Sequence, residues 1–283
     1  MNRSVREIIN YLLPFVAQAG AYSERIQQGV GTHDAKDGLT AFHHALSDAD
    51  LTIQSYIEVA LLAKYPGLSF FCEERKDSLN AKYFPSDASM EVLLDPIDGT
   101  RAYIDRRSQY QIICVIHDAH SIVGAICYMP RRNKCYIALN RQGTFLFTHD
   151  QVRDGEDGTK ITTAHLCSDG PVLVFNRPDL VAQLSPHVDV RDLVSEYELG
   201  EDQGFCSTDV LEGRASAIIS SPCQAIDGGA LAFIAAECGA VVSDFSGAPV
   251  ASYRQSVDRV LPGVLVTTSD ELHQRLLSIL SCA

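Results

Sequence analysis

The chain has 283 residues, 46% of them hydrophobic and 21% charged, which predicts a soluble globular protein with a core sufficient for two modest domains or one large one. Its net charge of −13 at pH 7 argues against nucleic-acid backbones and anionic membranes as partners, because both need a basic surface. A small anionic substrate stays compatible with this charge if divalent cations reverse the local field.

The cysteines and the N-terminus favour a cytoplasmic protein. The nine cysteines form no C-x-x-C pair and lie mostly inside apolar runs, a pattern typical of reduced, buried thiols. Pro14 and the polar residues after it interrupt any signal-peptide apolar region, and no stretch approaches membrane-spanning length.

The first third of the chain predicts two helices and a strand. Residues 3–28 have the spacing of an amphipathic helix that Pro14 kinks, and a polar loop follows at 29–40. A second helix opens at Asp48 or Asp50, and a short strand at 68–72 runs straight into Glu73-Glu74. The apolar stripe of the second helix is Ile53, Tyr56, Ile57, Ala60 and Leu61.

The stretch at 91–101 is the centre of the prediction. Residues 92–94 read as a buried strand, which we expect to end at Asp95 because Pro96 cannot donate to a sheet ladder. Asp98 then leads into Gly99. Two carboxylates at a strand end, beside a glycine, suit metal-assisted phosphate chemistry. A turn with a solvated aspartate is the simpler interpretation, and the motif alone leaves both open.

The remainder predicts an antiparallel meander followed by an α/β segment. Its strands are expected at 111–117, 122–128, 135–139 and 144–147, and then at 171–175, 217–219, 240–242 and 263–267. Helices are expected at 227–238 and 269–280. The acidic segment 148–160 is the candidate boundary. We therefore expect an α+β domain at 1–155 that carries most metal ligands, and an α/β domain at 156–283 that contributes Asp227 and the substrate loops.

Acidic residues at the ends of these elements fit a two-metal site. Mg²⁺ takes oxygen ligands and keeps several waters, so two or three carboxylates per ion suffice. Asp95 is the natural bridge, Asp98 and Asp227 complete one ion, and Glu73 completes the other with a carbonyl of the turn. One ion would lower the pKa of a bound water, and both would offset charge on the phosphate.

Phosphate oxygens would be received by Gly99, Thr100 and Arg101, which follow the turn. Simpler alternatives stay open for each position. Asp50 could only favour its helix start, Glu73-Glu74 could be a solvated turn, Asp227 could cap its helix, and Arg101 could be a surface charge.

Four sequence segments resemble signatures of the inositol monophosphatase superfamily. Residues 95–100, Asp-Pro-Ile-Asp-Gly-Thr, resemble its first signature, and residues 225–239 with 241–244 resemble its second. Glu73-Glu74 resembles the family's Gly-Glu-Glu, and residues 47–50 resemble its Thr-x-x-Asp. The order and approximate spacing of all four agree, so the resemblance covers nearly the whole chain.

The resemblance implies a five-layered αβαβα sandwich, with an antiparallel sheet in the N-terminal part and a smaller mixed sheet in the C-terminal part. It also implies hydrolysis of a small phosphate monoester with two or three Mg²⁺ ions, usually in a homodimer. The implied first ion is held by Glu73, Asp95 and the Ile97 carbonyl, and the second by Asp95, Asp98 and Asp227. Thr100, oriented by Asp50, would position the attacking water near Glu73, so all three residues are implied as catalytic.

Departures from the pattern concern substrate choice. Ile226 replaces a tryptophan, and Ser220 lies about where inositol phosphatases carry a glutamate that binds ring hydroxyls. Arg101 is closer to the basic residue of 3′(2′),5′-bisphosphate nucleotidases, which are one alternative; a non-catalytic metal- or nucleotide-binding relative is another. A haloacid-dehalogenase-like phosphatase is rejected, because Pro96 occupies the position of its nucleophilic aspartate.

Overall fold

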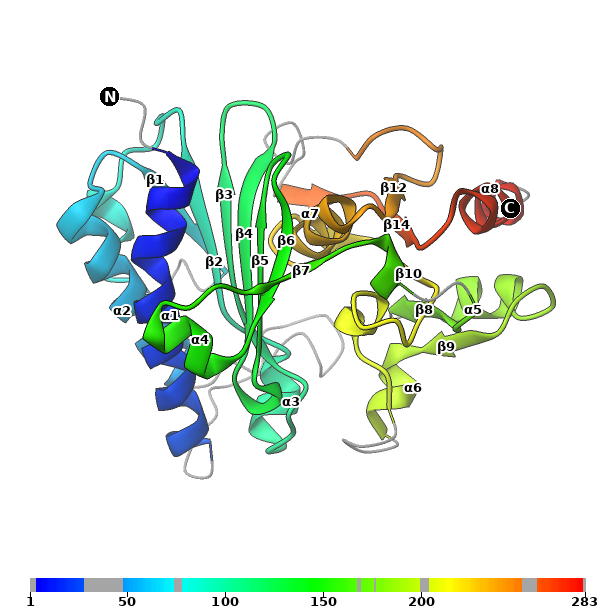
Figure 1. The fold of residues 1–283 in the computed structure, drawn as a ribbon, viewed down its shortest axis with the longest axis horizontal. Coiled ribbons are helices and arrows are strands. Elements are labelled where there is room, and N and C mark those ends of the chain that lie inside the picture. The colour runs from blue at the N-terminus through cyan, green and yellow to red at the C-terminus, as the bar shows by residue number, and fades with distance from the viewer. Residues whose placement is uncertain are drawn as a thin grey trace. The chain divides into compact units, whose positions relative to one another are not determined.

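The computed structural model describes residues 4–27, 48–73, 78–166, 169–175, 177–198, 204–250 and 259–281. The predicted loop at 29–40 and Glu74 lie outside them. The chain divides into two compact units (Figure 1). The first comprises Met1–Leu139 and Phe145–Thr159, and the second comprises Asn140–Thr144 and Lys160–Ala283.

The first unit is built on a seven-stranded sheet in the order β1 to β7. Neighbouring strands from β2 to β5 are antiparallel, whereas β1 pairs with β2 in parallel. The predicted meander is confirmed, and a parallel edge strand is added to it. The strands are β1 (Ser69–Cys72), β2 (Glu91–Asp98), β3 (Gln111–His117), β4 (Ile122–Met129), β5 (Lys134–Leu139), β6 (Gly143–Phe147) and β7 (Thr159–Ile161).

Strand β2 does not end at Asp95, as the sequence predicted, but continues to Asp98. Its pairing with β3 shifts register between Asp95 and Asp98, which marks a β-bulge. A bulge leaves residues out of the ladder, so Pro96 needs no N–H group there. The expectation was wrong because it treated proline as a strand end rather than as a bulge residue.

Helices α1 (Val5–Ile26) and α2 (Asp48–Lys64) pack on one face of this sheet and on each other (Figure 1). Both predicted helices are confirmed, and Pro14 lies inside α1. Tyr56 was expected in the buried stripe of α2 but is 37% exposed. The shorter helices of this unit are η3 (Ala81–Tyr83), α3 (Thr100–Ile104), η4 (Pro130–Arg132) and α4 (His149–Asp154), the last inside the 148–160 segment.

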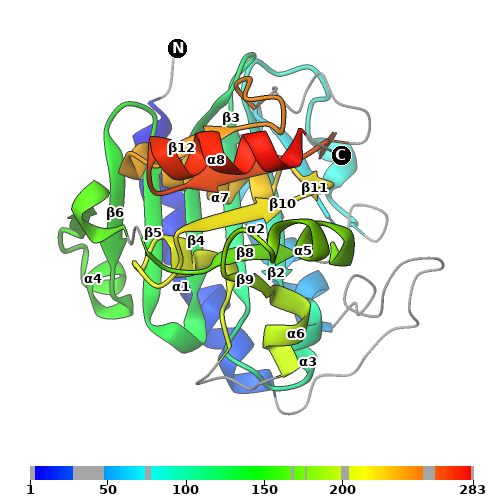
Figure 2. The same cartoon turned by 90° about the vertical axis from the view of Figure 1, so that its right-hand side faces the viewer.

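The second unit contains a mixed five-stranded sheet in the order β12-β14-β10-β8-β9. Helix α7 packs on one face of it, and α5 and α8 pack on the other (Figures 1 and 2). The smaller mixed sheet is therefore as predicted. Its strands are β8 (Val172–Phe175), β9 (Val190–Asp192), β10 (Ala217–Ser220), β12 (Val241–Ser243) and β14 (Val264–Thr267), with β11 (Cys223–Gln224) and β13 (Val260–Leu261) forming a separate pair. Its helices are η5 (Thr163–His165), α5 (Pro178–Leu184), α6 (Leu193–Glu198), η6 (Ser207–Val210), α7 (Gly228–Cys238) and α8 (Asp270–Leu280).

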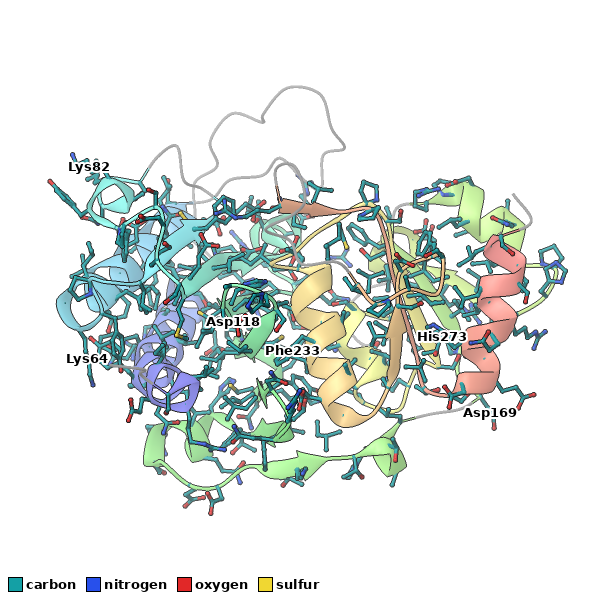
Figure 3. All side chains as sticks on the ribbon, turned by 90° about the horizontal axis from the view of Figure 1, so that it is seen from above. Lys64, Lys82, Asp118, Asp169, Phe233 and His273 are labelled. Atoms are coloured by element: carbon teal, nitrogen blue, oxygen red, sulfur yellow. The ribbon has the colours of Figure 1, made fainter. Side chains whose placement is uncertain are left out.

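His273 of α8, labelled in Figure 3, is 3% exposed and joins three elements of the second unit. Its Nε2 lies 2.8 Å from the hydroxyl of Ser243, and its Nδ1 lies 2.9 Å from the hydroxyl of Thr267. Burial lowers the pKa of this imidazole from the ordinary 6.5, although the charge of Asp270 opposes the shift. The neutral ring therefore ties α8 to β12 and β14.

Seven cysteines in the described part of the chain are free thiols, and most of them are buried, as predicted. Within the same residues, no helix has both the length and the hydrophobicity required to cross a bilayer.

Candidate metal centre

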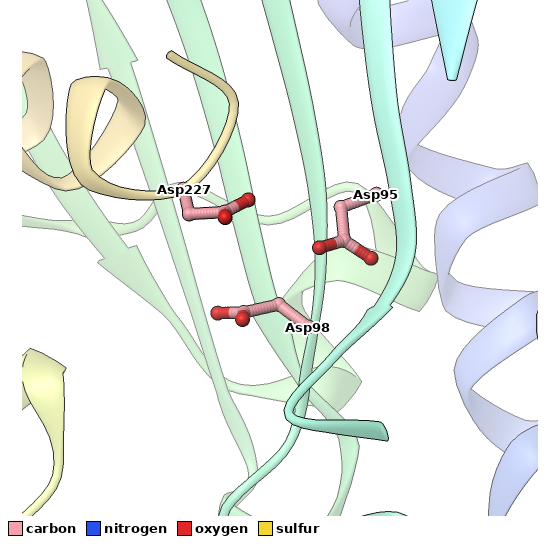
Figure 4. Close-up of side chains that lie close together, drawn as sticks. All are labelled: Asp95, Asp98 and Asp227. Carbon is pink, nitrogen blue, oxygen red and sulfur yellow. The ribbon is translucent and has the colours of Figure 1, made fainter. Parts of the chain in front are cut away.

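The bulge in β2 turns the side chains of Asp95 and Asp98 to one face of the seven-stranded sheet. Asp95 lies opposite Ile113 and Asp98 lies opposite Gln111, so two intervening residues of β2 face a single intervening residue, Ile112, of β3. Directly opposed residues share a face, as do residues two apart on one strand. Both carboxylates therefore lie on the face away from α1 and α2. Figure 4 draws these two side chains together with that of Asp227.

The turn that follows Asp95 is held by short local hydrogen bonds. The Ile97 N–H donates to Asp95 Oδ1 over 3.0 Å, and the Thr100 hydroxyl donates to the Ile97 carbonyl over 2.9 Å. The Ile97 side chain is fully buried in the core against α1 and α2. A carboxylate and a carbonyl are thus fixed within one turn, and such hard oxygen atoms are the donors that Mg²⁺ prefers. The residues present fit this ion.

Asp50 lies in the first turn of α2 and is 2% exposed. Burial raises the pKa of Tyr103 in α3 above its usual range, and repulsion from Asp50 and from the ionised forms of Tyr110 and Tyr22 adds to this shift. Asp50 is therefore close enough to α3 to act on it electrostatically. The Tyr103 hydroxyl also donates to the Ser23 carbonyl over 2.7 Å, which ties α3 to α1.

Glu73 lies in the turn after β1 and its side chain is exposed. Its N–H donates to the carbonyl of Leu94 over 3.3 Å. The structure thus brings the backbone of Glu73 beside β2, one residue before Asp95.

Arg101 of α3 pairs with Asp105, with 3.0 Å between Nε and Oδ2. The side chains are 43% and 31% exposed, and exposed pairs at this helical spacing stabilise by only about 0.3–0.5 kcal/mol. Breaking this ion pair so that the guanidinium can bind another anion therefore costs little.

In the second unit, Asp227 is the N-cap residue of α7, but its side chain makes no capping hydrogen bond. The simple interpretation that this aspartate caps its helix is therefore wrong. A Cβ atom at Gly228 would lie 2.6 Å from Cys223 Sγ, so the helix start needs glycine for close packing. Burial raises the pKa of Cys223 to about 12, so this packed thiol stays neutral. A hydrogen bond with Ser220 lowers the pKa of this thiol but does not outweigh burial. Ile226 is 1% exposed.

Two residues with clear contacts escaped the sequence reasoning. Glu237 of α7 accepts the backbone N–H groups of Arg141 and Gly143, both over 3.0 Å, and so holds the β5–β6 turn. Gln111 donates from Nε2 to Asp98 Oδ2. Gln111 is a polar residue at the start of a mostly apolar strand. Only the strand register connects it with Asp98.

Relatives of known sequence include two kinds of protein. SuhB of Neisseria meningitidis serogroup B is 26% identical over 242 residues, covering 83% of this chain and 88% of SuhB. The 3′(2′),5′-bisphosphate nucleotidase CysQ of Aggregatibacter actinomycetemcomitans is 22% identical over 248 residues, with 86% of each chain covered.

Solved structures share the fold. SuhB from Bartonella henselae matches with a TM-score of 0.72 at 16% identity, over 97% of this chain and 98% of that one. An IMPase/NADP phosphatase complexed with Mg²⁺ and phosphate matches with a TM-score of 0.75 at 18% identity, over 99% of this chain and 97% of that one. The family model described as "Inositol monophosphatase family" matches residues 14–283, which is nearly the whole chain. This chain belongs to the inositol monophosphatase family.

Proposed function

We propose that this protein is a Mg²⁺-dependent phosphatase that hydrolyses a small phosphate monoester. The observation that supports it most is the bulged end of β2, where Asp95 and Asp98 share one face of the sheet. Family membership supplies the reaction class. From the family resemblance and the cysteine pattern we also propose a cytoplasmic homodimer.

We propose that Asp227 of α7, the third side chain drawn in Figure 4, joins Asp95 and Asp98 as a ligand of the same ion. Asp95 would also help to hold a second ion, together with Glu73 and the Ile97 carbonyl. The donor chemistry supports this assignment, since all five ligands are hard oxygen atoms. Bound Mg²⁺ lowers the pKa of a coordinated water and offsets charge on the phosphate.

The chain's own residues then orient the reactants. The Thr100 hydroxyl donates a hydrogen bond to the Ile97 carbonyl, so its oxygen lone pairs remain available to accept a hydrogen bond from the attacking water. We propose that Asp50, buried in α2, holds α3 and hence Thr100 in place. The backbone N–H groups of Gly99 and Thr100 contact phosphate oxygens, and Asp227 contributes to substrate binding from α7.

The test is phosphate release from a panel of phosphate esters, measured with and without Mg²⁺ and with added Li⁺. We expect Mg²⁺-dependent turnover that Asp98→Asn abolishes. Asp118→Asn is the matched control, because Asp118 lies in the exposed turn between β3 and β4. Bound divalent ions without turnover on any ester would instead support a non-catalytic relative.

A bisphosphate substrate is the second candidate, favoured by the likeness to CysQ and by Arg101 directly after Thr100. If Arg101 contacts a second phosphate, Arg101→Ala lowers kcat/KM for 3′-phosphoadenosine 5′-phosphate more than for a monophosphate. Asp105→Asn is the matched control, since it removes the ion pair with Arg101 while retaining the guanidinium. Equal losses on both substrate classes would exclude this role.

A further inference from the structure

We propose that Gln111 is a positioning residue for Asp98 and that the Cys127 thiol sets the direction of the Gln111 amide. This inference rests on the proposed metal centre, because its consequence is tighter binding of a divalent ion. It concerns a row of three side chains on neighbouring strands of the first unit.

Strand register places the three residues in line. Asp98 of β2 lies directly opposite Gln111 of β3, and Ile113 of β3 lies directly opposite Cys127 of β4. Gln111 and Ile113 are two residues apart and share a face, so Cys127 is the diagonal neighbour of Gln111 on the side of the sheet that carries Asp98. The printed sequence separates these residues by 13 and 16 positions.

Two hydrogen bonds run along this row. The Cys127 thiol lies 2.9 Å from Gln111 Oε1, and Gln111 Nε2 donates to Asp98 Oδ2. Cys127 is 3% exposed and Gln111 is 8% exposed, so bulk water has little access to replace either bond.

The order of donors determines the direction of the amide. A thiol is a donor, an amide has one donor end and one acceptor end, and an ionised carboxylate only accepts. If the amide were reversed, its carbonyl oxygen would face the Asp98 carboxylate and its NH₂ group would face the thiol. Cys127 therefore holds the oxygen on its own side and directs the NH₂ group to Asp98.

The consequence is a fixed carboxylate plane at a proposed metal ligand. Outer groups that orient a metal-ligating carboxylate typically change metal affinity 10–100-fold when removed. Gln111 is suited to this role because it donates without adding charge. A glutamate at this position would repel Asp98, and an apolar residue would remove this hydrogen bond from the carboxylate.

The experiment measures Mn²⁺ binding to the intact protein without substrate, from the loss of the free Mn²⁺ signal in electron paramagnetic resonance. We expect Gln111→Met, which keeps the side-chain length but removes the donor, to weaken binding about 10-fold. Cys127→Ala is expected to weaken binding by a smaller factor. Cys127→Ser, whose hydroxyl still donates, restores the wild-type affinity, and such rescue is not expected of a purely structural role.

Cys135→Ala is the matched control, because Cys135 is equally buried but lies in the core against α1 and α2. The proposal is overturned if Gln111→Met binds Mn²⁺ like the wild type, or if Cys127→Ala and Cys135→Ala weaken binding equally. If Gln111→Met does not fold, the comparison of Cys127→Ala with Cys127→Ser decides the matter, because both changes are small in volume.

The same titration separates this inference from the proposed function. A wild-type protein that binds Mn²⁺ but hydrolyses no ester contradicts the phosphatase assignment and leaves the role of Gln111 intact. Normal Mn²⁺ affinity in Gln111→Met overturns that role and leaves the phosphatase assignment intact. A wild-type protein that binds no Mn²⁺ overturns both.

Discussion

Removing the Glu58 carboxylate is expected to destabilise the first unit substantially. Glu58 lies in α2, is fully buried, and accepts hydrogen bonds from Ser78 Oγ over 2.5 Å and from Asn80 Nδ2 and Gln54 Nε2, each over 3.1 Å. Ser78 Oγ in turn accepts the N–H groups of Asn80 and Ala81. One carboxylate thus connects α2 to the chain segment beyond Glu73.

The magnitude follows from these bonds. A hydrogen bond to a charged group contributes about 1.5–3 kcal/mol, but Ser78 and Asn80 are partly exposed and regain bonds to water. We therefore expect Glu58→Ala to lower the free energy of unfolding by about 3–4 kcal/mol. Glu58→Gln is expected to lower it by about 1–2 kcal/mol, because the amide keeps one acceptor and sets an NH₂ group against a donor.

Differential scanning calorimetry measures the effect. At about 2–4 °C per kcal/mol, Glu58→Ala lowers the Tm by about 6–16 °C. Glu271→Gln, an exposed glutamate in the first turn of α8, is the control and changes stability by less than about 0.5 kcal/mol. A Glu58→Met protein as stable as the wild type would refute the reasoning, since it would show that the donors need no carboxylate.

Three further predictions concern the site, the turn and the pH response. Asp95→Asn abolishes phosphate release and leaves the far-ultraviolet circular dichroism spectrum unchanged; residual turnover near the wild-type rate contradicts its bridging role. Gly99→Ala lowers the free energy of unfolding by about 1–2 kcal/mol or more, because φ is +85° and the new Cβ would lie 2.7 Å from a backbone carbonyl oxygen. Denaturant unfolding measures the effect, and Gly67→Ala, with open space around it, is the control. Burial lowers the folded-state pKa of His273, so the unfolded chain takes up a proton first, and stability falls as the pH drops from about 6.5 toward that lower pKa. Urea unfolding of His273→Gln shows a flatter pH dependence in that window; an unchanged slope would exclude His273 as its source.

The sequence predicted the elements well, because apolar periodicity and turn residues are local signals. It failed where tertiary neighbours decide. Tyr56 has the spacing of the buried stripe but lies at its edge, where the exposed side chain reaches the Gln18 side chain of α1. Glu58 carries no local sequence signal of its burial, since its partners Ser78 and Asn80 lie 20 and 22 residues further along the chain. The acids at 95 and 98 were recognisable from their motif, whereas the link from Gln111 to Asp98 depends on strand register.

The bulge explains why the two acids are separated by a proline and an isoleucine. A regular strand with two acids two residues apart would also set both carboxylates on one face. The extra residue adds a backbone carbonyl outside the ladder, because neither Pro96 nor Ile97 has a partner in the β2–β3 register. Pro96 tolerates that position since it has no N–H group to pair, and the Ile97 side chain fills the core behind the sheet. The Ile97 carbonyl then receives the Thr100 hydroxyl, so one irregular turn supplies two carboxylates, a carbonyl and an oriented hydroxyl.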